Sequence, residues 1–233
     1  MTSNDLSKIL REHGDPEYAK HSRRFFKTGE GEYGERDQFL GIRVPALRQY
    51  ANKFSGISLI EIHKLLKSIY HEERLCALFL LVKKFEKSKH EKSVIYRLYL
   101  DNTKYINSWD LVDCSAYKIV GPYLEDKNKS PLYKLARSKD LWERRIAIIS
   151  TLHFIKKMQF DDTLEISKKL LNDKEDLIHK AVGWMLREIG KHDPKAEREF
   201  LLNSYKRMPR TMLRYAIEKF PELERKKYLQ GDI

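Results

Sequence analysis

The chain has 233 residues, which is enough to bury a hydrophobic core as one domain or as one unbroken repeat array. Charged residues make up 34% and hydrophobic residues 41%, a globular composition, and no run approaches the roughly 20 apolar residues that a membrane helix needs. Lysine and arginine (46) exceed aspartate and glutamate (34), so the formal charge of +12 favours a polyanionic partner, and lysine-rich solubility without a partner is the alternative.

The first twenty residues contain no apolar stretch that would serve as a secretory signal. The two cysteines, Cys76 and Cys114, lie in apolar helical contexts without metal-ligand spacing. Both observations favour a reduced, cytoplasmic location.

Apolar residues recur three and four positions apart almost throughout, which predicts helices and no strands. In chain order we expect an N-terminal helical pair at about 1–26, a glycine-bearing connector at 27–43 and a repeat array at 44–230. The connector holds four of the ten glycines, but the lysine of a Walker-type phosphate loop is missing from it. Proline marks five expected helix starts: Asp15-Pro16, Val44-Pro45, Ser130-Pro131, Asp193-Pro194 and Met208-Pro209.

An internal repeat organises the array. The segments RLCALFLLVKKF, RRIAIISTLHFI, HKAVGWMLREIG and LRYAIEKF each place a basic residue or histidine shortly before an alanine. Aligning these alanines (Ala77, Ala147, Ala181 and Ala216) gives gaps of 70, 34 and 35 residues, and the segment 107–124 supplies the missing unit. A period of roughly 35 residues with two helices per unit predicts an all-α, superhelical solenoid of HEAT-like helical hairpins within a single domain, 1–233. The curve of such a solenoid provides a concave, basic face.

Trp109 and Asp113 are four residues apart, so a helix places them on one face. An exposed indole can pack on a sugar or a cationic base, and a carboxylate can stabilise positive charge on a sugar ring. The same pair also fits a core tryptophan beside a salt-bridged aspartate. Asp110 lies one step round the helix, where a solvent-exposed charge or a cap is expected.

The segment HKAVGWMLRE places Lys180, Trp184 and Arg187 on one helix face. A tryptophan flanked by two cations is a poor core stripe and a good surface for a phosphate backbone.

Further cations stand near helix starts. Arg144 and Arg145 follow Trp142, and one of them should point away from the apolar stripe. Arg210 and Arg214 lie near a helix N-terminus, where cations and free amides both suit phosphate. Salt bridges to Glu143, Glu188 or Glu218 are the alternative use of these arginines.

Other chemistry has little support in the sequence. The eight histidines form no metal-binding spacing, and no nucleophile elbow or cysteine–histidine motif occurs. We therefore expect no metal and no organic cofactor.

The segments FFKTGEGEYGERDQFLGIRVP, NSWDLVD, LWERRIAI, HKAVGWMLRE and MPRTMLRYAIEKF occur in the order found in a known family. Together, from about Phe25 to Phe220, they resemble the bacterial DNA alkylation repair glycosylases of the AlkD type, which are built from HEAT-like repeats.

The resemblance implies a DNA glycosylase that hydrolyses the N-glycosidic bond of cationic N3- or N7-alkylated purines. It assigns the electrostatic work to Asp113, sugar packing to Trp109 and Trp184, and phosphate binding to Arg145 and Arg187. The family grips the DNA backbone and leaves the modified base outside a closed pocket.

Two positions depart from the family pattern and suggest a divergent branch. Phe25 falls near a family tyrosine, and His153 stands near a lysine that contacts the DNA backbone.

We therefore predict a monomeric, monofunctional DNA-alkylpurine glycosylase that acts on double-stranded DNA containing alkylated bases. Its predicted catalytic residues are Asp113, Trp109 and Trp184, and its predicted DNA-binding residues are Arg145, Arg187, Lys180, Arg210 and Arg214. A non-catalytic helical-repeat protein that binds DNA, RNA or an acidic protein remains the alternative.

Overall fold

The computed structural model describes all residues, 1–233, and consists of helices joined by loops, the longest of which is the segment 26–43. No strand forms, and the one β-type contact is an isolated bridge between Gln38 and Tyr70. The predicted all-α class is therefore confirmed. None of the helices combines the length and the apolar character needed to span a bilayer. The chain forms two compact units, residues 1–115 and 116–233, and its description as a single repeat domain stays a prediction.

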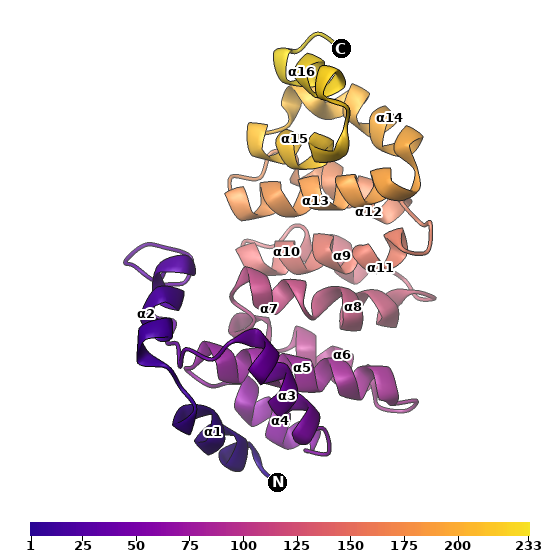
Figure 1. The fold of residues 1–233 in the computed structure, drawn as a ribbon. Helices are drawn as coiled ribbons and strands as arrows, with labels where there is room; N and C mark the ends of the chain where they lie inside the picture. Colours follow the sequence, from indigo (N-terminus) through magenta and orange to yellow (C-terminus); the bar gives the residue numbers. More distant parts are fainter. The chain divides into compact units, whose positions relative to one another are not determined.

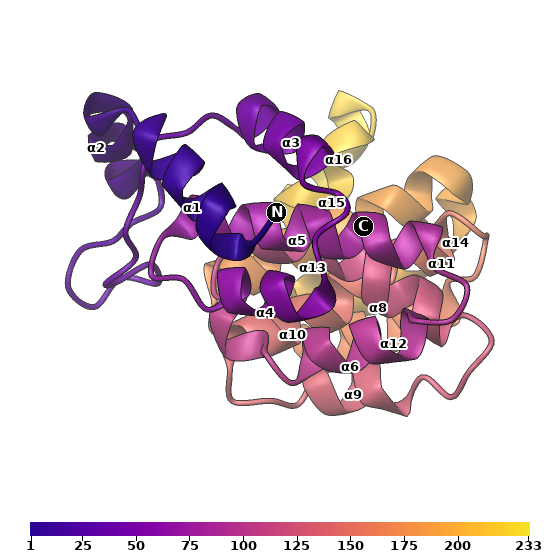
Figure 2. The ribbon, with the colours of Figure 1, turned by 90° about the horizontal axis from the view of Figure 1, so that it is seen from below.

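The first unit is organised around one long helix, α5 (His71–Lys87), whose residues are mostly buried. In Figure 2, α3 lies on one side of α5 and α4 on the other. Helices α6 and α7 also pack on α5, and α1 packs on α4. The other helices of this unit are α1 (Ser3–Glu12), α2 (Pro16–Phe25), α3 (Val44–Lys53), α4 (Leu59–Leu66), α6 (Lys92–Leu100) and α7 (Trp109–Asp113), with a 3-10 turn at Thr103–Tyr105.

The second unit is a stack in which α8, α10, α13 and α15 follow one another as successive layers (Figure 1). Helices α9 and α12 pack beside α10 and α13, and α11 packs on α8. The bounds are α8 (Ala116–Leu124), α9 (Ser130–Leu135), α10 (Leu141–Ser150), α11 (Leu152–Ile155), α12 (Asp161–Leu170), α13 (Asp176–His192), α14 (Pro194–Ser204), α15 (Arg210–Ala216) and α16 (Glu222–Gln230), with 3-10 turns at Tyr205–Arg207 and Ile217–Lys219.

Proline positions predicted the helix starts well. Helices α2 and α14 begin at Pro16 and Pro194, each capped by an aspartate side chain, and α3 and α9 carry proline within their first two residues. Three of the five starts are thus displaced by one residue, because Pro45 and Pro131 are the second residues of their helices and Pro209 is the N-cap of α15. Proline suits each of these places, since the N–H that it lacks has no partner at a helix start.

The aligned alanines of the repeat are all fully buried, at the centres of α5, α10 and α13 and at the end of α15. Their small side chains let neighbouring helices approach, as the sequence pattern predicts.

Glycine allows a still closer approach at two helix crossings of the second unit. A Cβ atom at Gly183 in α13 would lie 2.4 Å from the carbonyl oxygen of Met212 and 2.5 Å from the Cβ of Tyr215, both in α15. A Cβ atom at Gly121 in α8 would lie 2.5 Å from the carbonyl oxygen of Ser150. These contacts involve backbone, so the helices cannot keep their spacing if a side chain is added.

The variant Gly183→Ala should therefore lower the free energy of unfolding by about 1–3 kcal/mol, the usual effect of overpacking, although alanine is the better helix former. Urea denaturation followed by circular dichroism measures this. Gly56→Ala is the matched control, because nothing lies within 4 Å of a Cβ at Gly56. Equal stabilities of Gly183→Ala and the wild type would contradict the close packing of α13 on α15.

Candidate active site and nucleic-acid interface

Helix α7 contains the first predicted pair. Trp109 and Asp113 are its first and last residues and both are half-buried, whereas Leu111 and Val112 between them are fully buried. The apolar pair anchors α7 on the core of the first unit. A helix of this length therefore holds the indole and the carboxylate on one partly exposed face, as predicted.

The indole of Trp109 belongs to an aromatic cluster, which we define as Phe25, Phe26, Phe39, His71 and Trp109. The rings of Phe26 and Trp109 are stacked, with centroids 5.5 Å apart and planes at 15°. Phe25 meets the indole edge-on at 5.9 Å and is 58% exposed. Stacked and edge-on contacts are the favoured geometries of aromatic pairs, so the cluster fixes the orientation of the indole.

A buried ionic network, which we define as His71, Asp37, Asp110 and Arg74, supports the same helix. His71 Nδ1 lies 2.8 Å from Asp37 Oδ2, and His71 Nε2 lies 2.8 Å from Asp110 Oδ2. Arg74 donates from one nitrogen to both oxygens of Asp37, at 2.8 Å each. Asp110 therefore ties α7 to the N-terminus of α5, which is not the solvent-exposed or capping role expected from the sequence.

The network determines the charge of His71. Burial alone would lower the pKa of the imidazole, but Asp110 and Asp37 outweigh burial and raise the pKa to about 9. Burial raises the pKa of Asp37, yet the bonds from His71 and the charge of Arg74 hold it below its usual value. His71 is thus an imidazolium at neutral pH, and its ring stacks on Phe39 at 4.6 Å.

The sequence analysis did not predict this network, although one segment of the sequence indicates it. The segment HEER at 71–74 begins an otherwise apolar helix, and all four of its residues are buried. Four consecutive charged or titratable residues at the start of a core helix need partners from elsewhere in the chain.

The second unit contains the remaining predicted residues. Lys180, Trp184 and Arg187 all lie on α13, as the spacing predicts. Lys180 pairs with Asp176 at 2.7 Å, and Arg187 pairs with Glu218. The half-buried indole of Trp184 donates its Nε1–H to Glu188 at 3.0 Å. Both cations therefore have acidic partners when no ligand is bound.

The arginines of α10 have internal partners too. Arg144 binds Asp173 through its Nε, at 2.6 Å. Arg145 is only 4% exposed and donates to the carbonyl oxygen of Leu177. This bond connects α10 to the first turn of α13. A phosphate contact by Arg145 would require that bond to be exchanged, so the role assigned by the resemblance stays a prediction.

Arg210 and Arg214 lie on α15, of which Arg210 is the first residue. Both side chains are exposed, and Arg210 donates to the carbonyl oxygen of Leu229 at 2.7 Å. His153, the departure from the family pattern in this unit, lies 2.9 Å from Glu125 and is half-buried.

The eight predicted site residues thus divide between the units. The structure places Trp109 and Asp113 on one helix, and it places Arg145, Lys180, Trp184, Arg187, Arg210 and Arg214 on three helices of the second unit. The assembly of both groups into one site stays a prediction. No group of three or more histidine, cysteine, aspartate or glutamate side chains could hold a metal ion.

Comparisons with known proteins agree with the helical architecture. The sequence model of a family described as DNA alkylation repair enzyme matches residues 6–220. A solved structure titled as a predicted DNA alkylation repair enzyme from Enterococcus faecalis is similar in fold. The TM-score is 0.69 and the sequences are 18% identical, over 90% of this chain and 97% of that chain. No curated protein matches this sequence.

The variant His71→Gln should lower the free energy of unfolding by about 3 kcal/mol at pH 6, because it leaves the carboxylate of Asp110 without its cation and leaves Asp37 with Arg74 alone. The folded-state pKa of about 9 lies above the ordinary value of 6.5. The contribution of the charge is therefore complete below pH 6.5 and is lost as pH rises through 9. Urea denaturation at pH 6 and at pH 9.5 should show the difference between wild type and variant narrowing. His90→Gln, at an exposed site, is the control. A difference independent of pH would contradict a charged His71.

Proposed function

Because the chain belongs to the DNA alkylation repair enzyme family, we propose that it is a monofunctional DNA glycosylase for cationic alkylated purines. The proposed substrate is double-stranded DNA that contains N3- or N7-methylpurine, and the products are the free base and an abasic site. The observation that supports this most directly is the arrangement of α7, where a carboxylate and an indole share one partly exposed face.

The chemistry needs little more than this pair. An alkylated purine carries formal positive charge and leaves readily, so positive charge builds up on the deoxyribose as the bond to the base lengthens. A carboxylate at Asp113 stabilises that charge and orients the attacking water. The indole of Trp109 offers a flat, electron-rich face to the sugar. A cationic leaving group does not require a closed pocket for its departure.

The cations of the second unit serve the phosphate backbone in this proposal. Arg187, Lys180 and Arg145 bind phosphates after exchanging their internal partners, while the exposed Arg210 and Arg214 bind at the start of α15. Trp184 packs on the deoxyribose from α13.

The variant Asp113→Asn should reduce the rate of methylpurine release by about 10²–10³, because a preorganised charge stabiliser is lost, while DNA binding is kept. The assay follows free 7-methylguanine and 3-methyladenine from methylated DNA, with Asp126→Asn, at an exposed position, as the control. If the wild type releases no methylpurine, the glycosylase proposal is wrong and the alternative, a non-catalytic protein that binds nucleic acid, is favoured. Normal release by Asp113→Asn would remove this residue from the mechanism.

The ion pair between Arg187 and Glu218 gives a second test, in which a variant should bind DNA more tightly than the wild type. The variant Glu218→Gln frees the guanidinium, so DNA should bind about three- to tenfold more tightly. Glu222→Gln is the matched control, because it removes the same charge from another exposed ion pair, with Lys226. An equal increase in DNA affinity in the two variants would show that the change in net charge alone causes the tighter binding. Fluorescence anisotropy with a labelled duplex measures both affinities.

A further inference from the structure

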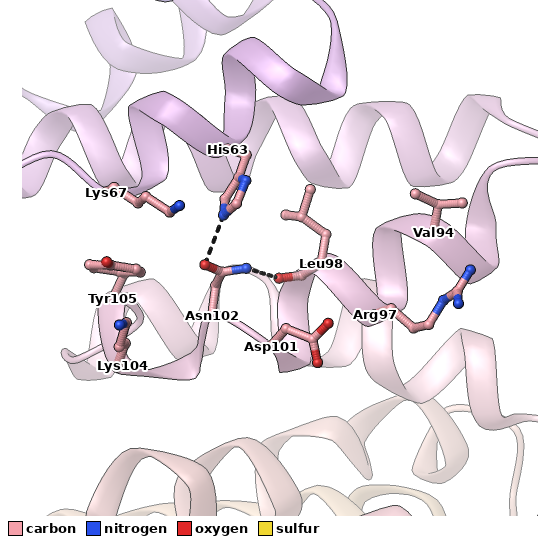
Figure 3. Close-up of a pocket in the computed structure, with 9 residues that line it drawn as sticks. All are labelled: His63, Lys67, Val94, Arg97, Leu98, Asp101, Asn102, Lys104 and Tyr105. Atoms are coloured by element: carbon pink, nitrogen blue, oxygen red, sulfur yellow. Dashed lines mark hydrogen bonds between the residues drawn. The ribbon is translucent and has the colours of Figure 1, made fainter.

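A cavity of about 530 Å³ lies in the first unit among α4, α6 and the 3-10 turn at Thr103–Tyr105 (Figure 3). Its volume is within the roughly 300–1,000 Å³ that small-molecule sites occupy. None of the residues that line it belongs to α7, which carries the proposed catalytic pair. The proposed glycosylase chemistry therefore makes no use of this cavity.

Three cationic side chains line the cavity without an acidic partner. Lys67 follows α4, Arg97 lies on α6 and Lys104 lies in the 3-10 turn, and none of them forms an ion pair. The only carboxylate of the wall is Asp101. Three cations against one carboxylate leave the wall positively charged.

Two of the cations predicted to bind DNA are arranged differently, since Lys180 and Arg187 are already paired with carboxylates of the second unit. Like charges that surround one cavity repel one another, and no side chain of this cavity compensates all of them. An anion that binds there removes this repulsion, so the cavity favours an anionic ligand.

A buried amide holds the middle of the wall. Asn102 is only 7% exposed, its Oδ1 lies 2.9 Å from His63 Nε2, and its Nδ2 donates to the carbonyl oxygen of Leu98 at 2.8 Å. These bonds fix the amide in one orientation without a ligand. In Figure 3 the two lysines lie on one side of Asn102 and Arg97 lies on the other. Cations on two sides suit an elongated anion better than a single compact one.

We propose that this cavity binds an anion of linked phosphate groups, either the triphosphate of a nucleotide or an inorganic polyphosphate. Arginine binds phosphate oxygens through its planar fork of N–H donors, and lysine binds them as a point charge. Tyr105 is half-buried and lines the cavity beside Lys104, whose Nζ lies 5.0 Å from the centre of its ring. The site goes beyond the proposed glycosylase and does not depend on it.

Titration calorimetry of the full chain with tripolyphosphate, at about 0.15 M salt to screen the general charge of the protein, tests the site. We expect saturable binding of one anion per chain, at least about tenfold tighter than that of inorganic phosphate, because only linked phosphates reach the cations on both sides. Arg97→Gln and Lys104→Gln should each weaken it about tenfold, since each removes hydrogen bonds to a charged group. Lys53→Gln is the matched control, because Lys53 is an exposed lysine of α3 outside the cavity.

The variant Asp101→Asn tests the same site in the opposite direction. It removes the only carboxylate of the wall and should tighten tripolyphosphate binding about threefold. Asp126→Asn removes the same charge from an exposed position outside the cavity and should leave the affinity unchanged.

ATP distinguishes the two sources of linked phosphates. Tighter binding of ATP than of tripolyphosphate, with the difference lost in Tyr105→Leu, supports a nucleotide whose base packs on the ring. Equal or weaker binding of ATP supports an inorganic polyphosphate.

Three results would overturn the site. The first is the absence of saturable tripolyphosphate binding, and the second is an equal loss of affinity in Lys53→Gln and Arg97→Gln. The third is a fall in affinity for a labelled duplex in Arg97→Gln and Lys104→Gln that Lys53→Gln does not show, because the cavity would then belong to the DNA interface. Selective loss of tripolyphosphate binding with unchanged duplex affinity supports the site, whether or not the chain releases methylpurines.

Discussion

The first unit depends on the burial of four consecutive polar residues at the start of α5. Their partners come from three other parts of the unit. The connector provides Asp37 for His71 and Arg74 and the backbone at 40–42 for Glu72, α7 provides Asp110 for His71, and α1 provides Arg11 for Glu73. Buried charges are tolerated only when they are paired, and removing one partner is strongly unfavourable. Helix α1, the connector and α7 are therefore held by one helix end, through ion pairs and hydrogen bonds as well as through apolar packing.

This arrangement has a consequence for the proposed chemistry. Trp109 and Asp113 lie on a helix of five residues, which is too short to be stable alone. Buried Leu111 and Val112 fix its inner face, and the bond between Asp110 and His71 fixes its first turn. The carboxylate and indole are thus presented from a rigid support, which electrostatic stabilisation of a developing charge requires. The glycine-bearing connector, which resembled a phosphate loop only weakly, contributes Asp37 and Phe39 to this support instead.

Local patterns in the sequence predicted the helices, most of their starts and the small residues between layers, because periodicity and capping are properties of neighbouring residues. They also placed Trp109 with Asp113, and Lys180 with Trp184 and Arg187. They did not predict the partners of His71 or Arg74, which are more than thirty residues away, since no local spacing records a long-range ion pair. The burial of Arg145 was missed for a related reason: periodicity left open which of two adjacent arginines faces inward, and the carbonyl of Leu177 determines it.

The internal partners of the cations on α13 also affect the thermodynamics of binding to a polyanion. DNA binding usually draws its free energy from ions that leave the phosphates when protein cations arrive. Arg187 and Lys180 already neutralise Glu218 and Asp176, so each phosphate they take up leaves a protein carboxylate that must recruit a cation from solution. The net number of ions released is then smaller than the number of phosphates contacted. If the chain binds a duplex as proposed, its affinity therefore depends less steeply on salt concentration than the number of phosphates contacted by these cations would give.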